Sequence, residues 1–170
     1  MKHIILIGFM GCGKTSVGKR LARSMGLPFV DMDDEIKKQA GMEITEIFKR
    51  YGERYFRELE TDVLRQMSRE TQPMVISAGG GMPMEPENQR ILAGMGTVIL
   101  LEAAVETLVE RLKNDNTRPM LAGGDLRTRI ETLQKERKPV YERVCDVRIT
   151  TDGKDFSQII DEIRRAEEKN

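Results

Sequence analysis

Short apolar runs alternate along the chain with segments in which apolar residues recur every three or four positions. Five of these runs are bounded by turn residues and predict β-strands: His3–Ile7, Pro28–Asp31, Met74–Ala78, Thr97–Leu101 and Cys145–Thr150. Short apolar strands that alternate with helices are typical of a parallel sheet covered by helices on both faces. The pattern therefore predicts an α/β fold.

The intervening segments have the helical period. Their apolar stripes are Val17, Leu21 and Met25; Ile44, Ile47, Phe48 and Tyr51; Phe56, Leu59, Val63 and Met67; Val105, Leu108, Val109 and Leu112; and Phe156, Ile159, Ile160 and Ile163. Residues 113–124 break this pattern with polar residues, a proline and paired glycines, and their length favours a mobile lid loop. No repeat or linker divides the chain, so we expect one domain over residues 1–170.

Composition narrows the class of protein. Among 170 residues, 39% are hydrophobic and 33% are charged, with 28 basic and 28 acidic side chains. This balance disfavours a protein that holds nucleic acid through its phosphates. The apolar stretches are shorter than the roughly 20 residues that span a bilayer, and no cleavable signal is visible. Two cysteines and one histidine exclude a disulfide framework and a structural zinc site. We expect a cytoplasmic protein without a nucleic-acid or membrane partner, and a monomer because no large apolar stripe is left unexplained.

Residues 8–15, GFMGCGKT, match the phosphate-binding pattern G-x-x-x-x-G-K-[ST]. An apolar run precedes the motif and an amphipathic helix follows it, which argues against a chance match. Glycines allow successive N–H groups to surround phosphate oxygens at the positive end of the helix. The pattern assigns Lys14 to the β- and γ-phosphates and the Thr15 hydroxyl to Mg²⁺. The predicted nucleotide cradle comprises Gly11, Cys12, Gly13, Lys14, Thr15 and Ser16.

Cys12 lies inside this cradle. We interpret it as a small filler whose backbone N–H contributes to phosphate binding. The alternative is a reactive thiol, which would require a lowered pKa.

Asp31 and Asp33 follow the second apolar run. If the strand continues through them, both point to the same side, where one could hold a Mg²⁺-bound water and the other a substrate hydroxyl. The alternative is helix capping, because Asp33, Asp34 and Glu35 also suit a first helical turn. Ligands bind at the carboxyl ends of parallel strands. We therefore favour a functional role for Asp31 and Asp33, and assign Asp34 and Glu35 to the helix cap.

Arg137 occupies an apolar stripe that runs along residues 126–144. The other members of the stripe are Leu126, Ile130, Leu133, Val140 and Val144. A guanidinium that faces inward needs a buried anion, either a ligand or a carboxylate of the protein, and the sequence leaves both open. Pro139 is expected to disrupt the helix nearby.

Two other arginines have both a structural and a functional interpretation. Arg57 and Glu60 are three residues apart, a spacing that fits an exposed ion pair of a few tenths of a kcal/mol. Arg118 lies in the lid loop, where it is either a solvated charge or an arginine that stabilises a transferring phosphoryl group. Arg111, on the preceding helix, is placed to lie against a nucleotide base.

Three consecutive glycines, Gly79, Gly80 and Gly81, follow the third apolar run. Their backbone N–H groups could approach a ligand closely, although a plain turn also fits.

In order and spacing, GFMGCGKTSVGKRLA, FVDMD, FRELE, SAGGG, TRPML and ERKPVYE resemble the shikimate kinase family, small P-loop kinases of the nucleoside-monophosphate-kinase type. The resemblance covers nearly the whole chain. It implies a five-stranded parallel sheet between helices on both faces, a three-layer sandwich with a lid loop. It also implies that ATP, with one Mg²⁺ ion, phosphorylates the 3-hydroxyl of shikimate on the route to chorismate and the aromatic amino acids.

The resemblance also implies residue roles. Lys14 holds the phosphates, Thr15 binds Mg²⁺ and Asp31 assists through water. Asp33 contacts the shikimate hydroxyls and accepts the proton, within a shikimate-binding helical segment at about residues 33–61.

For the remaining residues the resemblance implies that Arg57 and Arg137 hold the shikimate carboxylate, and that the glycines at 79–81 approach it through the backbone. Arg118 becomes the lid arginine. The loop Thr151–Lys154 lies beside adenine, and Lys154 is its nucleotide-binding residue. The chain departs from the family pattern at Met120, usually leucine, and at Cys12, usually a smaller residue.

Two rival functions remain on the sequence. One is a kinase of another small hydroxylated anion, such as gluconate, on the same fold. The other is a non-catalytic ATP-binding module that uses its lid to recruit a protein, which Asp33, Arg57 and Arg118 beside the cradle argue against.

Overall fold

A parallel sheet forms the centre of the computed structural model, which describes residues 2–169. Within those residues the sheet contains β1 (His3–Ile7), β2 (Phe29–Asp31), β3 (Val75–Ser77), β4 (Gly96–Glu102) and β5 (Val147–Thr150). The strands lie in the order β2-β3-β1-β4-β5, and every pairing is parallel. The predicted five-stranded parallel sheet is therefore confirmed, with strand ends that differ by one or two residues.

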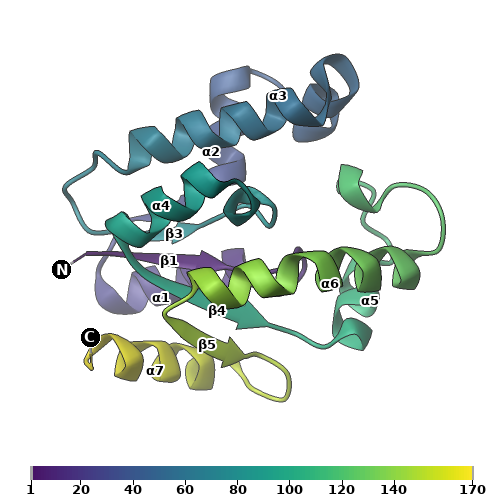
Figure 1. The fold of residues 1–170 in the computed structure, drawn as a ribbon. Helices are drawn as coiled ribbons and strands as arrows, with labels where there is room; N and C mark the ends of the chain where they lie inside the picture. Colours follow the sequence, from purple (N-terminus) through teal and green to yellow (C-terminus); the bar gives the residue numbers. More distant parts are fainter. Residues whose placement is uncertain (1, 170) are drawn as a thin grey trace.

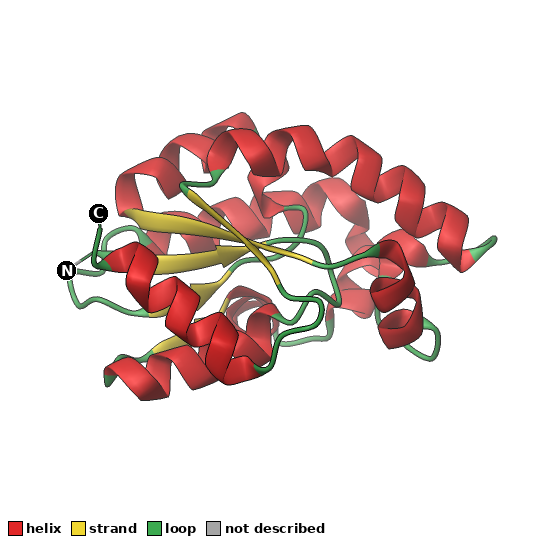
Figure 2. Cartoon of the chain, turned by 90° about the horizontal axis from the view of Figure 1, so that it is seen from below, coloured by secondary structure: helices red, strands yellow, loops and turns green. Residues whose placement is uncertain are grey.

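Helices cover both faces of this sheet. They are α1 (Lys14–Met25), α2 (Met32–Ala40), α3 (Ile44–Met67), α4 (Pro86–Met95), α5 (Val105–Leu112), α6 (Leu126–Val144) and α7 (Phe156–Glu167), with short 3₁₀ helices η1 (Met82–Met84) and η2 (Pro119–Leu121). Figure 1 shows α3 and α4 on one side of the sheet and α7 on the other, and Figure 2 shows the twisted strands between the helical layers.

Alternation along β1 creates two cores. Ile4 and Leu6 pack in one core with α1 and α7, whereas Ile5 and Ile7 pack in the other with α3 and α4. All four side chains are fully buried, because successive residues of a strand point to opposite faces. The three-layer arrangement predicted from the sequence follows from this alternation.

The helices differ from expectation in three places. The stripes at 44–51 and 56–67 belong to one helix, α3, which is kinked at Gly52 (φ 83°, ψ 174°), a backbone conformation that favours glycine. Helix α4 was not predicted. The expected disruption at Pro139 is wrong, because α6 continues to Val144. Beyond the proline, Tyr141 is buried and its hydroxyl donates to the Gly80 carbonyl, which anchors the end of the helix.

The carboxyl ends of the strands meet at one edge of the sheet because all strands are parallel. The phosphate-binding loop follows β1, Asp31 ends β2, and the three glycines come shortly after β3. The lid segment connects α5 to α6, as predicted, and includes η2. This edge is where the candidate site forms.

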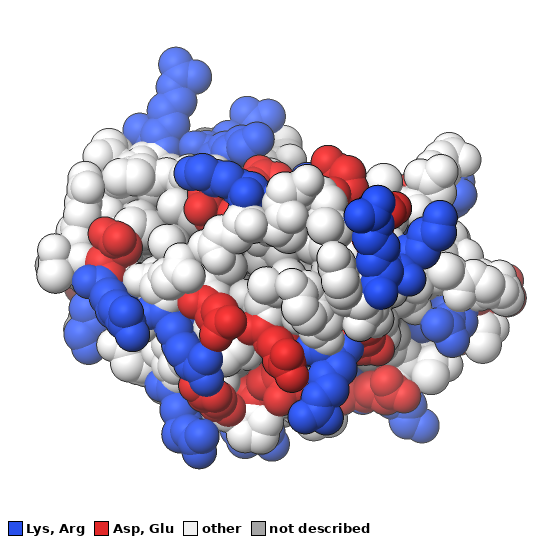
Figure 3. All heavy atoms as spheres, turned by 90° about the horizontal axis from the view of Figure 1, so that it is seen from above, with Lys and Arg blue, Asp and Glu red and all other residues white. Residues whose placement is uncertain are grey.

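The outer surface reflects the neutral composition. On the face in Figure 3, acidic and basic side chains are interspersed, without a division into one basic and one acidic region. Within residues 2–169, no helix is both long and apolar enough to cross a membrane.

Candidate active site

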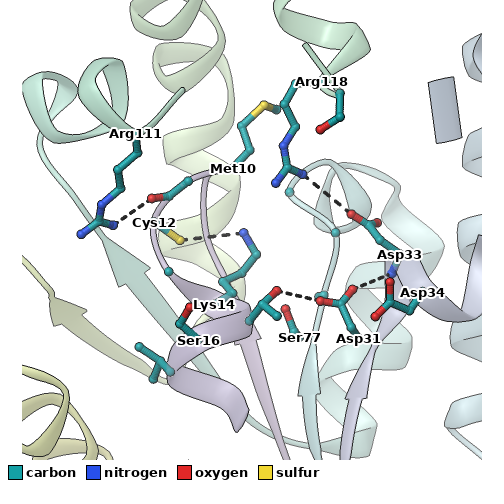
Figure 4. Close-up of a pocket in the computed structure, with 18 of the residues that line it drawn as sticks. Met10, Cys12, Lys14, Ser16, Asp31, Asp33, Asp34, Ser77, Arg111 and Arg118 are labelled. Carbon is teal, nitrogen blue, oxygen red and sulfur yellow. Dashed lines mark hydrogen bonds and ion pairs between the residues drawn. The ribbon is translucent and has the colours of Figure 1, made fainter. Parts of the chain in front are cut away.

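Two adjoining cavities open at the carboxyl edge of the sheet. The larger, of about 980 Å³, is lined by the phosphate-binding loop, the start of α2 and part of the lid (Figure 4). Thr151, Lys154, Asp155 and Phe156 complete its lining. The smaller, of about 60 Å³, is lined by Arg57, Glu60, Arg137 and the three glycines, and by the lid at residues 117–120. Asp33 and Arg118 line both cavities. The structure thus places these two residues where the cavities meet.

The phosphate-binding loop has the backbone that its glycines allow. Gly11 and Gly13 have φ values of 80° and 99°, and a Cβ on Gly11 would lie 3.1 Å from the Leu112 side chain. Lys14 Nζ donates to the carbonyls of Gly8 (2.7 Å) and Phe9 (3.1 Å). Helix α1 begins at Lys14, so its N-terminal dipole points into the larger cavity.

Cys12 is 1% exposed, and its Sγ lies where a side chain on Gly8 would go. This burial supports the interpretation of Cys12 as a filler. Ser16, on the first turn of α1, lines the larger cavity with the rest of the predicted cradle.

Thr15 and Asp31, the predicted magnesium ligands, are in direct contact. The Thr15 hydroxyl donates to Asp31 Oδ2 over 2.7 Å, and Asp31 Oδ1 accepts from the Asp33 backbone N–H over 3.0 Å. Asp31 is therefore the N-cap of α2, a role that the sequence interpretation gave to Asp34 and Glu35. Those two residues do lie in the first turn, where their negative charges interact favourably with the positive end of the helix dipole.

Asp33 reaches the site from a helix, not from a strand. The strand β2 ends at Asp31, so the expectation that the strand continues through Asp33 is wrong. The first turn of α2 nevertheless directs the carboxylate toward Arg118, whose Nη1 lies 4.0 Å from Asp33 Oδ2. Burial and the nearby Asp31 raise the pKa of Asp33 above its ordinary value, while Lys14 and Arg118 oppose this shift. Arg118 Nε also donates to Asp115 within the lid (3.2 Å).

Arg137 is 3% exposed, and its buried Nη1 has no hydrogen-bond partner among the described residues. Its guanidinium lies 5.8 Å from the centre of the Phe9 ring, and no ion pair joins it to a carboxylate within residues 2–169. The alternative of an internal ion pair is therefore contradicted. A buried cation aimed into a cavity without a counter-ion favours an anionic ligand.

Arg57 and Glu60 form the ion pair that the spacing suggested, at 2.5 Å, but the pair is not exposed. The Glu60 side chain is 1% exposed and that of Arg57 is 14% exposed. Burial raises the pKa of Glu60 to about 7, against the opposing effect of Arg57. From the sequence, Glu60 was expected only as the partner of an exposed pair, because its burial depends on packing against segments distant in the chain.

The three glycines leave no room for side chains. A Cβ on Gly81 would overlap the Arg57 guanidinium, and a Cβ on Gly79 would lie 2.6 Å from Glu60 Oε2. Tyr141, also missed from the sequence, holds the Gly80 carbonyl through its hydroxyl. These close approaches favour the ligand-binding interpretation over a plain turn.

The far end of the larger cavity is bounded by Arg111 and the loop after β5. Arg111 Nη1 donates to the Gly11 carbonyl over 2.8 Å, and Lys154 Nζ pairs with Glu162 at 2.8 Å. Both residues line this cavity, together with Thr151. The structure therefore brings all the predicted site residues to one edge of the sheet.

Comparison with known proteins gives the family. The family model described as Shikimate kinase matches residues 10–167. The chain belongs to the shikimate kinase family. A shikimate kinase from Persephonella marina is 44% identical over 163 residues, covering 96% of this chain and 97% of the relative.

Solved structures of family members agree. The shikimate kinase from Acinetobacter baumannii, in complex with shikimate, superposes with a TM-score of 0.95 at 33% identity, covering 100% of this chain and 94% of that one. The shikimate kinase from Aquifex aeolicus gives a TM-score of 0.84 at 36% identity, covering 98% and 96%. Like its family, the chain is an ATP-dependent kinase.

Proposed function

We propose that this shikimate kinase family member transfers the γ-phosphoryl group of ATP to the 3-hydroxyl of shikimate, giving shikimate 3-phosphate and ADP. The observation that carries the choice of acceptor is the buried, unpaired Nη1 of Arg137 in the smaller cavity. With Arg57 lining the same cavity, two guanidiniums are available for one carboxylate. The comparison structure with shikimate supports this choice.

In the proposed complex the triphosphate occupies the phosphate-binding loop. Backbone N–H groups and the start of α1 surround its oxygens, and Lys14 exchanges its contacts with the Gly8 and Phe9 carbonyls for contacts with phosphate. Arg111 and Lys154 flank the adenine end of the cavity.

The residues at the mouth of the loop fit Mg²⁺. Thr15 and Asp31 present a hydroxyl and a carboxylate, which are the hard oxygen donors that Mg²⁺ takes. No cluster of three or more acidic, histidine or cysteine side chains within residues 2–169 could hold a metal by itself. This favours an ion that arrives with ATP and keeps phosphate and water ligands, and when bound it neutralises charge on the β- and γ-phosphates.

The transfer takes place where the two cavities meet. The acceptor oxygen forms its bond to the γ-phosphorus as the bond to the bridging oxygen of ADP breaks, and Asp33 accepts the hydroxyl proton. Its raised pKa makes Asp33 a stronger base than an exposed aspartate. Arg118 and Lys14 stabilise the charge on the transferring group. All these residues belong to one chain, so the site needs no partner subunit and the proposal includes activity as a monomer.

The deciding experiment measures ADP release with ATP, Mg²⁺ and either shikimate or gluconate, and identifies the product by mass spectrometry. We expect rapid formation of a singly phosphorylated shikimate and no product from gluconate. Faster turnover of gluconate would show that gluconate, and not shikimate, is the preferred acceptor. Tight nucleotide binding without turnover of either acid would favour the regulatory module.

A further inference from the structure

Helix α5 is fixed at both of its ends to walls of the larger cavity. At its C-terminal end, Arg111 Nη1 donates to the Gly11 carbonyl, and Leu112, 3% exposed, packs where a side chain on Gly11 would lie. This end therefore supports the phosphate-binding loop from outside. The lid begins directly after it.

At its N-terminal end, α5 has no capping side chain of its own, since the residue at the cap position is Ala104. Asp152, 48 residues further along the chain, supplies the missing acceptor. Asp152 Oδ2 accepts from the Ala104 N–H over 2.6 Å, and Oδ1 accepts from the Thr107 hydroxyl over 2.6 Å. A carboxylate in this position satisfies an otherwise unpaired donor and interacts favourably with the helix dipole.

The loop that carries Asp152 forms the opposite wall of the cavity. Thr151 is buried and bonds the Glu102 carbonyl through both its N–H (2.9 Å) and its hydroxyl (3.0 Å). Lys154 and Asp155 line the cavity, and Asp155 caps α7. The loop is thus held to β4 and α7, and Asp152 is its connection to α5.

We propose that Asp152 is a positioning residue for nucleotide binding. Through α5 it holds Arg111 and the phosphate-binding loop at a fixed distance from the loop 151–155. It thereby fixes the separation of the two cavity walls between which one nucleotide binds. Asp152 itself does not line the cavity. The inference rests on the proposed function, because it assigns the larger cavity to ATP.

The chain contains a matched control. Asp146 Oδ2 accepts from the backbone N–H of Val98 over 2.8 Å, so it also joins a residue next to β5 to a backbone N–H of the β4 segment, but it caps no helix. This bond lies at the opposite end of β4 and β5, away from the cavity. A purely structural role for such a carboxylate would give both positions the same effect on nucleotide affinity.

The test titrates a fluorescent ATP analogue, mant-ATP, with Mg²⁺ and no acid. We expect the dissociation constant to rise about tenfold for Asp152→Ala, the ratio that loss of a helix cap produces. We expect about threefold for Asp152→Asn, which removes the negative charge at the end of the helix, and about threefold for Thr107→Val, which removes one of the two bonds. We expect less than twofold for Asp146→Ala. In steady-state assays the KM for ATP rises in the Asp152 variants while the KM for shikimate stays constant.

Thermal unfolding of each variant separates affinity from folding. Equal losses of affinity at Asp146 and Asp152, or wild-type affinity in Asp152→Ala, would overturn the proposal. If Asp152→Ala does not fold, Asp152→Asn and Thr107→Val decide the result. A wild-type chain that binds mant-ATP but does not phosphorylate shikimate refutes only the proposed acceptor, whereas one that binds no nucleotide refutes both proposals.

Discussion

Replacing Arg137 by methionine separates ligand binding from stability. Arg137 is 3% exposed, and within residues 2–169 its Nη1 has no hydrogen-bond partner and no carboxylate forms an ion pair with its guanidinium. Substituting a buried ionic group by an apolar side chain of similar volume is often stabilising by about 1–4 kcal/mol. Here the loss of the contact with the Phe9 ring offsets part of this gain. We expect Arg137→Met to be more stable by about 1 kcal/mol, which raises Tm by about 2–4 °C for a chain of this size.

The same substitution is expected to weaken shikimate binding. Hydrogen bonds to charged groups contribute about 1.5–3 kcal/mol each. Loss of one or two such bonds to the shikimate carboxylate corresponds to about 3 kcal/mol, and hence to about a hundredfold rise in the KM for shikimate. The KM for ATP should stay within about twofold, because the nucleotide occupies the other cavity.

Differential scanning calorimetry without shikimate and a coupled ADP assay measure the two effects. Lys138→Met is the control, since its side chain is 60% exposed on the same helix and should change neither quantity. A variant at Arg137 that is less stable and still binds shikimate with wild-type affinity would refute the reasoning. Equal rises in both KM values would refute the carboxylate role.

Three further outcomes follow from the site. Asp33→Asn should lower kcat by about a hundredfold or more with small changes in both KM values, and unchanged turnover in the coupled assay would remove Asp33 from the mechanism. The pKa of Glu60 is raised to about 7, so the folded chain keeps this proton over a range in which the unfolded chain has lost it. The free energy of unfolding should therefore fall as pH rises from about 4.5 to 7, and Glu60→Gln should flatten the curve; an equal slope in the variant, measured by denaturant unfolding, would assign the dependence elsewhere. Gly81→Ala should displace Arg57 and raise the KM for shikimate about tenfold, whereas Gly94→Ala, where a Cβ meets open space, should not; equal KM values in the two variants would contradict the steric argument.

The sheet and the phosphate-binding loop could be predicted because their signals are local. Apolar runs of a few residues define the strands, and the loop motif depends on glycines within eight positions. Helix α4 was not predicted because its first half, PENQR, is polar and its apolar residues Ile91, Leu92 and Met95 are confined to its second half. The kink at Gly52 joins two stripes that looked like separate helices.

The site was predicted in part, and the features that were not predicted have a common cause. The stripe on α6 placed Arg137 inside, but only the structure shows that no carboxylate within residues 2–169 pairs with it. The burial of Glu60 and Tyr141 could not be predicted, because it results from packing between segments that are distant in the sequence. Asp33 lines the two cavities although the predicted strand does not reach it, since a strand end and a first helical turn both place a residue near the same sheet edge.

The contacts of Lys14 bear on the relative affinity of the loop for different nucleotides. Its ammonium contacts the Gly8 and Phe9 carbonyls, so a phosphate that recruits it must outcompete two acceptors of the loop itself. Carbonyl dipoles attract a cation less strongly than a charged phosphate oxygen does. In the proposed complex Lys14 contacts the β- and γ-phosphates, which AMP lacks, so AMP would leave the lysine on its two loop carbonyls. Discrimination between ATP and AMP would arise in this way from contacts that the protein makes with itself.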